Sequence, residues 1–366
     1  MRPLRPPLLM LGLIALVGVS TSGATGTGQA KQVKALVVGE RLVVSAPWPA
    51  AFAFDPSGRI FYGKRFTGQI RIFNPSTLSD TAFVKLPSVS KAGGEQGLLG
   101  LALDPAYPTN HFVYAFYSYR NSQVRIVRLT DTSGVGKGLK VILKIPVNSN
   151  QHLVGVIHFG SDQRLYAVMG DNDQRAQSQT LSTNRGKVLR MTTLGQAPPD
   201  NPFADKLIWS YGLRNSFGFT FDPQTGNLWE TENGPECNDE LNLIVAGGNY
   251  GWGPTETCAG TAPQNTNQDG PNPILPVAFY TPVTAPTGAA FCQGCGLGDS
   301  LEGRLIYGDW VNGDLHAVTL TTDRLGVASE SVLVDRAPQG VLAVERAPDG
   351  GLYFSDPAGI YKLTGS

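Results

Sequence analysis

The sequence predicts an all-β fold, a six-bladed β-propeller that forms a single domain. Two observations predict it. A motif of short apolar strands and turns recurs six times from Ala51 onward, at a spacing typical of propeller blades. The 366 residues also include 44 Gly and 26 Pro but no convincing long amphipathic helix after the N-terminal apolar stretch. This composition suits short strands joined by tight turns and argues against a parallel βαβ architecture.

The six motifs share one pattern, which the first of them shows as AFAFDPSGRIFYGKRFTGQIRIF. An apolar strand leads to a turn with Asp, Pro or Gly, then to a second strand with Leu-Tyr or an equivalent, and then to a third. The strands are rich in β-branched and aromatic residues and are bounded by turn residues. The motifs begin at Ala51, Gly97, Val154, Phe217, Thr287 and Gly340. A pair of β-sandwiches would contain similar strands but would not explain the regular recurrence, at about 55 residues per blade.

The N-terminus predicts export to the periplasm or the extracellular space. Two arginines precede an apolar stretch from Leu8 to Val19, which is too short to span a bilayer comfortably, and small residues up to Ala24 provide a cleavage site. A retained membrane anchor is the alternative. The expected organisation is a signal peptide at 1–24, a flexible leader at 25–40 and the propeller at 41–366.

Charge and cysteine content narrow the possible partners. The 29 basic and 29 acidic residues balance, so the protein has no field that would attract nucleic acid or an anionic membrane. No heptad pattern favours an oligomer, and a monomer is expected.

The four cysteines of an exported chain favour disulfides, and we expect Cys237 to pair with Cys258 and Cys292 with Cys295. A four-thiolate zinc site and a redox-active CxxC pair are the alternatives.

A histidine and an aspartate flank one predicted hairpin. His152 comes just before an apolar strand, and Asp171 ends the next strand in a Met-Gly-Asp turn. A hairpin would bring both to one end of a blade, where the carboxylate could orient the imidazole. Histidine is a suitable base for removing a proton from a sugar hydroxyl at neutral pH; a loop histidine bonded to the backbone is the alternative. His158 lies inside the strand and is expected to be structural.

One long segment carries a family resemblance. From Tyr211 to Trp252 the chain reads YGLRNSFGFTFDPQTGNLWETENGPECNDELNLIVAGGNYGW, which resembles the signature of the soluble quinoprotein sugar dehydrogenases, the glucose/sorbosone dehydrogenase family. Members of that family use pyrroloquinoline quinone (PQQ) and calcium on a six-bladed propeller. The resemblance implies oxidation of an aldose at the anomeric carbon to a lactone, with electrons passed to an external acceptor.

The resemblance also implies roles for individual residues. His152 matches the general base, Asp171 its partner, and Gln96 a residue that lines the cofactor and sugar pocket. Arg214 and Asn215 match a pair that contacts the quinone, where a guanidinium can stabilise developing negative charge.

Calcium ligands are implied in the same way. Gly234 and Pro235 match a step whose main-chain carbonyls bind the calcium on the cofactor side, and backbone carbonyls are suitable calcium ligands. Glu240, with the main chain near Asn249 and Tyr250, matches a second, structural calcium site.

The chain departs from the family where PQQ, a tricarboxylate, needs cations. A family lysine corresponds to Val311 or Asn312, and family arginines correspond to the stretch 340–343, which includes Leu342. Arg336 and Lys64 are the candidates to substitute. The usual His-x-Gly-Gly also differs, because the chain reads His152-Leu153-Val154-Gly155, with Val154 in place of the first glycine. Two hypotheses therefore remain: a dehydrogenase with a modified cofactor site, and a non-catalytic exported propeller that binds carbohydrate or protein. A calcium-dependent lactonase-type propeller ranks third.

Overall fold

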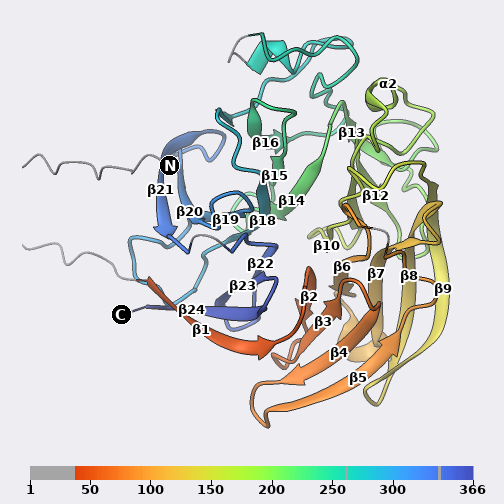
Figure 1. Cartoon of the computed structure of the whole chain (residues 1–366), viewed down its shortest axis with the longest axis vertical. Helices are drawn as coiled ribbons and strands as arrows, with labels where there is room; N and C mark the ends of the chain where they lie inside the picture. Colours follow the sequence, from red (N-terminus) through yellow and green to blue (C-terminus); the bar gives the residue numbers. More distant parts are fainter. Residues whose placement is uncertain (1–37, 92, 260–262, 337–338, 366) are drawn as a thin grey trace, which may run out of the picture. The chain divides into compact units, whose positions relative to one another are not determined.

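The computed structural model describes residues 38–91, 93–259, 263–336 and 339–365. The expected signal peptide (1–24) lies outside the described residues, as does the expected leader up to residue 37. The described chain forms six four-stranded antiparallel sheets, arranged as the blades of a propeller (Figure 1). The prediction of an all-β, six-bladed propeller is therefore confirmed. None of the helices in this described part has the length and apolar character needed to cross a bilayer.

The blades follow one another along the chain, and each of the six sequence motifs supplies one of them. Blade 1 comprises β2 (Ala51–Phe54), β3 (Ile60–Lys64), β4 (Gln69–Asn74) and β5 (Ser79–Lys85). Blade 2 comprises β6 (Leu98–Leu103), β7 (Phe112–Tyr119), β8 (Gln123–Thr132) and β9 (Val135–Pro146). Blade 3 comprises β10 (Ile157–Phe159), β11 (Leu165–Met169), β12 (Lys187–Met191) and β13 (Ile208–Tyr211). Blade 4 comprises β14 (Ser216–Phe221), β15 (Leu228–Glu232), β16 (Asp239–Ile244) and β17 (Ala278–Tyr280). Blade 5 comprises β18 (Pro286–Phe291), β19 (Leu305–Asp309), β20 (Leu315–Leu320) and β21 (Val327–Val334). The short helices are α1 (Tyr107–Asn110), α2 (Arg175–Ser178) and the 3-10 helix η1 (Pro263–Asn265).

Blade 6 joins the two ends of the described chain. Its strands are β22 (Ala343–Arg346), β23 (Leu352–Asp356), β24 (Gly359–Gly365) and, as the outermost strand, β1 (Val38–Ser45). The antiparallel β1–β24 pairing runs from Val38 opposite Gly365 to Ser45 opposite Gly359. The ring of blades is thus closed by backbone hydrogen bonds between residues far apart in sequence.

The innermost strands of the blades lie close together around the centre of the propeller (Figure 1). Glycine residues at two positions allow the inner strands of neighbouring blades to approach one another this closely. A Cβ atom on Gly100 of β6 would lie 2.0 Å from the carbonyl oxygen of Gly155, and one on Gly218 of β14 would lie 2.3 Å from that of Thr287. Any side chain at either position would therefore collide with the backbone of the next blade.

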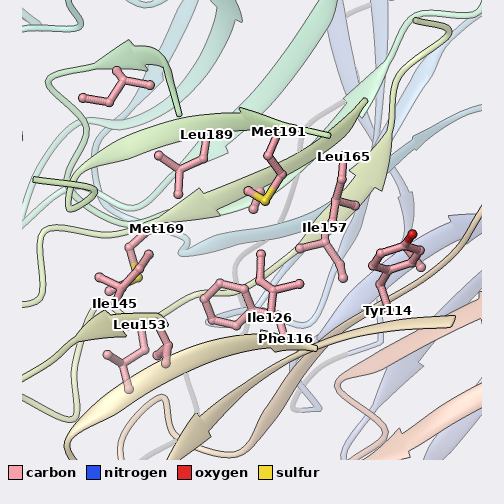
Figure 2. Close-up of a cluster of buried hydrophobic side chains, with 14 of the residues drawn as sticks. Tyr114, Phe116, Ile126, Ile145, Leu153, Ile157, Leu165, Met169, Leu189 and Met191 are labelled. Atoms are coloured by element: carbon pink, nitrogen blue, oxygen red, sulfur yellow. The ribbon is translucent and has the colours of Figure 1, made fainter. Parts of the chain in front are cut away.

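Six hydrophobic clusters fill the six interfaces between neighbouring blades. Figure 2 shows the cluster between blades 2 and 3, in which Tyr114, Phe116 and Ile126 face Leu165 and Met169. These side chains are at most 1% exposed. Because each blade buries its faces against two neighbours, no blade has a complete core of its own.

Both expected disulfides are present. Cys237 is bonded to Cys258 and Cys292 to Cys295, with Cα–Cα distances of 5.9 and 5.1 Å, and no cysteine is free. The pairing prediction is confirmed. With every thiol used, the zinc-thiolate and dithiol alternatives do not apply to this state of the chain.

Candidate active site

The centre of the candidate site is a histidine held by a buried aspartate. His152 lies between β9 and β10, Asp171 follows β11, and His152 Nδ1 is 2.6 Å from Asp171 Oδ1. Trp252 Nε1 donates to Asp171 Oδ2 at 2.8 Å. Because Asp171 accepts from Nδ1, the proton sits there and the lone pair is on Nε2. His152 side-chain exposure is 12% and that of Asp171 is 1%, so the imidazole reaches solvent while its partner does not.

The local sequence places the two loops against each other. A Cβ atom on Gly170 would lie 2.4 Å from the carbonyl oxygen of His152, so only glycine at this position lets Asp171 approach. His152 itself has a positive φ of 51°, an uncommon conformation for a residue with a side chain.

Arg214 and Asn215 stand beside this pair, in the connection from β13 to β14. The Asp171 amide donates to the Arg214 carbonyl at 2.8 Å. The Arg214 guanidinium donates from Nη1 to the carbonyl of Asn233 at 2.7 Å and lies 5.5 Å from the Trp252 ring. Burial lowers the pKa of Arg214, although the nearby carboxylates, Asp171 first among them, oppose this shift.

Glu95 connects these loops and was missed by the sequence analysis, which selected its neighbour Gln96. Its Oε1 accepts from Asn215 Nδ2 at 2.9 Å and its Oε2 from the Leu153 amide at 2.8 Å. Gln96 is 2% exposed, and its carbonyl accepts from Arg65 Nε at 2.8 Å. The sequence signal that could have identified Glu95 is an acidic residue in the segment GGEQG, directly before a buried strand.

The Gly234-Pro235 step lies in the turn between β15 and β16. The Gly234 amide donates to Asp239 Oδ1 at 2.8 Å, and Asp239 Oδ2 accepts from the amides of Thr284 and Ala285 at 2.6 and 2.7 Å. The buried Asp239, also missed by the sequence analysis, therefore fixes this turn against the entry to blade 5.

Three buried glutamates share one face of blade 4. In the β15–β16 register Glu232 is opposite Glu240, and Glu230 is opposite Asn242. Asn242 Nδ2 donates to Glu230 and Glu240 at 3.1 and 2.9 Å, and the Arg214 amide donates to Glu232. Three oxygens, Oε1 of Glu230, Oε2 of Glu232 and Oδ1 of Asn242, are buried with no hydrogen-bond partner.

These glutamates resist ionisation. Burial raises the pKa of Glu230 to about 8 and that of Glu240 to about 7, and it raises the pKa of Glu232 well above its usual value. The sequence analysis singled out only Glu240 of the three. The signal for the others was a pair of alternating glutamates within an otherwise buried strand, LWETE.

The main-chain carbonyl of Tyr250, rather than its side chain, is the group that lies near Glu240. Asn267 Nδ2 donates to the Tyr250 carbonyl at 2.7 Å, and the Asn267 side chain also hydrogen-bonds the Glu240 carboxyl group. The two groups that the sequence analysis assigned to one calcium ion are therefore bridged by a single amide.

The positions that correspond to the family's lysine and arginines carry uncharged side chains. Val311 is 55% exposed and Leu342 is buried. Arg336, a candidate substitute, is bonded to Glu40 at 2.5 Å and to Asp356 at 2.9 Å, and it stacks on Phe354 at 4.6 Å. Its charge is thus already neutralised within blade 6.

Comparison with known proteins identifies related sequences and structures. The family model for glucose/sorbosone dehydrogenase matches residues 44–360. Aldose sugar dehydrogenase YliI of Escherichia coli is 29% identical, over 84% of this chain and 86% of that protein. Quinoprotein glucose dehydrogenase B of Acinetobacter calcoaceticus is 32% identical, over 56% of this chain and 50% of that protein. The PQQ-bound aldose sugar dehydrogenase of Streptomyces coelicolor superimposes with a TM-score of 0.76 and 27% identity, over 90% of this chain and 98% of that structure.

Proposed function

This chain belongs to the glucose/sorbosone dehydrogenase family, and we propose that it oxidises an aldose at the anomeric carbon to the lactone, using PQQ and calcium. The electrons would pass to an external acceptor. The observation that carries the proposal is the arrangement of His152, Asp171 and Trp252, with Arg214 packed beside the same indole ring.

His152 acts as the base in this proposal. Its Nδ1–H donates to Asp171, so Nε2 receives the proton of the anomeric hydroxyl. The Asp171 carboxylate stabilises the resulting imidazolium, and the Trp252 hydrogen bond keeps that carboxylate in position. The 12% exposure of His152 allows a sugar to reach it.

The residues around Arg214 fit a polar cofactor. Asn215 Oδ1 and Asn233 Oδ1 are buried with no hydrogen-bond partner, which is costly unless a ligand satisfies them. When bound, PQQ would supply a two-electron oxidant. Arg214 and Asn215 would hold it, and only one of the five N–H donors of Arg214 is needed for the bond to Asn233.

The positions at which the family resemblance predicts basic residues fit the three carboxylates of PQQ less well. Val311 and Leu342 carry no charge, and Arg336 is already paired. Each lost charge-assisted contact is worth roughly 1.5–3 kcal/mol, so we expect weaker PQQ binding than a site with a full basic clamp would give. This same observation supports the second candidate function, an exported propeller that binds carbohydrate or protein without turnover.

Calcium has two proposed positions. One is at the carbonyls of Gly234 and Pro235, a turn that Asp239 fixes. The other is at Glu240 and the Tyr250 carbonyl, beside the unpartnered carboxylate oxygens of Glu230 and Glu232. Calcium prefers oxygen ligands of these kinds, and a divalent cation would offset the cost of burying several carboxylates together.

We also propose that the protein is exported as a monomer, with a signal peptide at 1–24, a leader from residue 25 and a propeller domain that begins at Val38 with β1 rather than at residue 41. The two disulfides support an oxidising compartment. N-terminal sequencing of the mature protein from culture medium or periplasm tests this; a retained Met1 in a membrane fraction would contradict it.

The experiment that tests the activity starts with PQQ titration of the purified, calcium-loaded protein by calorimetry, followed by dye reduction with a panel of aldoses. We expect PQQ binding and sugar-dependent reduction, which His152→Ala abolishes while PQQ binding remains. His111→Asn is the matched control, since His111 is an exposed histidine at the end of α1. Absence of PQQ binding at millimolar concentration would overturn the proposal and favour the binding propeller.

A further inference from the structure

Blade 2 carries a local excess of positive charge that the balanced total charge does not reveal. Between His111 and Gln151 the sequence contains six basic residues and one acidic residue, whereas the whole chain contains 29 of each. The single acidic residue, Asp131, is buried and accepts hydrogen bonds from the Tyr107 hydroxyl and the Gly134 amide. We refer to the six basic residues as the basic rim: Arg120, Arg125, Arg128, Lys137, Lys140 and Lys144.

The basic rim lies along the outer edge of the blade. β8 and β9 are the two outer strands of blade 2, and β9 is its edge strand (Figure 1). The three lysines are exposed side chains of β9, and at about 3.3 Å per residue they extend over roughly 23 Å. Arg125 and Arg128 lie on β8, and Arg120 lies in the turn before it. The positive charge is therefore arranged as a line.

The strand register places like charges opposite each other. Arg125 is opposite Lys144, and Arg128 is opposite Lys140. Like charges in directly opposed positions destabilise a sheet. Within the described part of the chain, no carboxylate oxygen lies within 4.0 Å of a charged nitrogen of the basic rim. The rim is therefore not neutralised inside the protein, unlike Arg190, which is paired with two carboxylates.

Aromatic rings position the two arginines of β8 without neutralising them. Arg125 Cζ lies 3.3 Å from the centre of the Tyr119 ring, and Arg128 Cζ lies 4.0 Å from that of Phe112. Lysines on an edge strand would by themselves protect that edge from pairing with another chain. A second row of cations on β8 adds repulsion that such protection does not need. An anionic partner outside the molecule would offset this cost.

Exposed aliphatic side chains accompany the lysines. Val135 and Leu139 of β9 are 46% and 37% exposed, and Leu194 in the loop after β12 is 47% exposed. That loop packs on β9, because a Cβ atom on Gly195 would lie 2.1 Å from the Ile142 carbonyl oxygen. Lysines beside exposed aliphatic groups suit the headgroup region of a lipid bilayer, where ammonium groups contact phosphates and aliphatic groups reach the acyl boundary.

We propose that the basic rim docks this protein on the surface of an anionic phospholipid bilayer, as a peripheral and reversible contact. A fluid bilayer can bring lipid headgroups to a line of cations of this length, whereas a folded acidic protein would need a matching row of carboxylates. The inference goes beyond the proposed oxidation and depends on no step of it. Because β9 ends at Pro146, six residues before His152, a docked molecule would hold the candidate active site close to the membrane.

Vesicle binding tests the proposal. The probes are vesicles of phosphatidylcholine alone and vesicles in which roughly 30% of the lipid is phosphatidylglycerol, with binding measured by co-sedimentation and calorimetry. The full chain is compared with the compact unit Leu36–Ser366, which contains every strand that the structure describes but lacks the N-terminal apolar stretch. We expect the shorter chain to bind only the anionic vesicles, and the full chain to bind them at least as tightly. Added salt should weaken the binding steeply.

Removal of charge identifies the surface that binds. Replacing all three lysines of the basic rim with glutamine should weaken binding to anionic vesicles about 100-fold. It should not lower the melting temperature, because repulsion within blade 2 decreases. Replacing the same lysines with arginine should retain the binding. The matched control replaces three basic residues of blade 6 with glutamine, namely Arg41, Arg346 and Lys362. It changes the net charge equally and should weaken the binding by less than about threefold.

A soluble probe distinguishes a bilayer from an acidic protein. Leu139→Ser should weaken vesicle binding about fivefold and leave unchanged any binding of poly-L-glutamate, a soluble acidic polypeptide. Binding of poly-L-glutamate that depends on the three lysines, without binding of vesicles, would overturn the proposal and assign the rim to an acidic protein. Equal losses in the lysine variant and the blade 6 control would also overturn it, because net charge alone would then explain the attraction. Binding of neither probe would leave the lysines only the protection of the β9 edge.

Discussion

In the proposed reaction, Asp171 determines which nitrogen of His152 acts as the base. Replacing it with asparagine preserves size but presents an amide N–H to Nδ1, which favours the tautomer with its lone pair on the wrong nitrogen. We expect Asp171→Asn to lower kcat about 10³-fold with little change in melting temperature. Asp173→Asn is the control, since Asp173 is 47% exposed and 3.6 Å from Nδ1; it should lose less than tenfold. Equal losses in the two variants would mean that Asp171 does not position the imidazole.

Lys187 also stabilises parts of the chain other than its own strand, because its side chain bonds main-chain carbonyls of a neighbouring segment. It is fully buried, and its Nζ donates to the carbonyls of Gln177, Ser178 and Arg185 at 2.8, 2.8 and 2.6 Å. Lys187→Met would leave three carbonyls without this donor. We expect a loss of about 3 kcal/mol or more in the free energy of unfolding, measured by urea denaturation. A loss below 1 kcal/mol would show that water replaces the ammonium group.

At the scale of elements, the connection from β16 to β17 holds Trp252 against Asp171. The Cys237–Cys258 disulfide, with a sequence separation of 21, joins this connection to the turn between β15 and β16, whereas Cys292–Cys295 closes a separation of 3. Loop-closure entropy predicts about 3 kcal/mol of stabilisation from the longer loop and about 2 kcal/mol from the shorter. We expect the double variant Cys237→Ser with Cys258→Ser to lose more stability than the Cys292→Ser, Cys295→Ser pair. It should also lose activity at a temperature where it remains folded, and the reverse order would contradict the prediction.

Blade 5 contains an ionic network that should make stability depend on pH. Burial opposes a charge on His316, but hydrogen bonds to Asp309 at 2.9 Å and Glu330 at 3.0 Å outweigh it and raise its pKa to about 9. Because the folded pKa exceeds the unfolded value of 6.5, this stabilisation is complete below pH 6.5 and is lost as the pH rises through 9.

The corresponding free-energy change is at most about 3 kcal/mol between pH 6.5 and pH 9. Urea denaturation at intervals of pH should show this decline in the native chain and in His111→Asn, but not in His316→Gln. A decline that persists in His316→Gln would assign it to other groups.

The strands and their order could be predicted from the sequence because alternating apolar residues and turn residues repeat in all six blades. The disulfide pairs were predicted as well. Glu95, Asp239, Glu230 and Glu232 were not, because a carboxylate in a sequence gives no sign of which part of the fold it will face. The pairing of Arg336, a candidate for the missing basic clamp, could not be predicted either, since its partner Glu40 lies 296 residues away in sequence.

If calcium binds as proposed, we expect it to stabilise the whole molecule through blade 4, where unpartnered oxygens of Glu230, Glu232 and Asn242 are buried. A cation bound only by the folded state stabilises it by about 2.7 kcal/mol at 100 times its dissociation constant. We expect removal of calcium with a chelator to lower the melting temperature by roughly 3–5 °C. Calcium should restore the value and magnesium should not. Glu240→Gln should reduce the shift, and an undiminished shift in that variant would place the stabilising ion elsewhere.

Closure of the ring is the property that belongs to no single blade. β1 supplies the outer strand of blade 6, and Val44 and Ala46 enter the cluster between blades 6 and 1 with Phe52 and Ile360. A chain that starts at residue 46 would expose the edge of β24 and open this cluster, so the interface between the first and last blades would lose both its hydrogen bonds and part of its core.

We expect such a chain to melt at a markedly lower temperature and to aggregate, whereas a chain that starts at Leu36 should behave as the full protein does. A synthetic peptide of residues 38–45, added in excess, should recover part of the lost stability, because it can pair with β24 in the same register. If the shortened chain melts at the same temperature as the longer one, the propeller is held closed by the contacts of its inner strands alone.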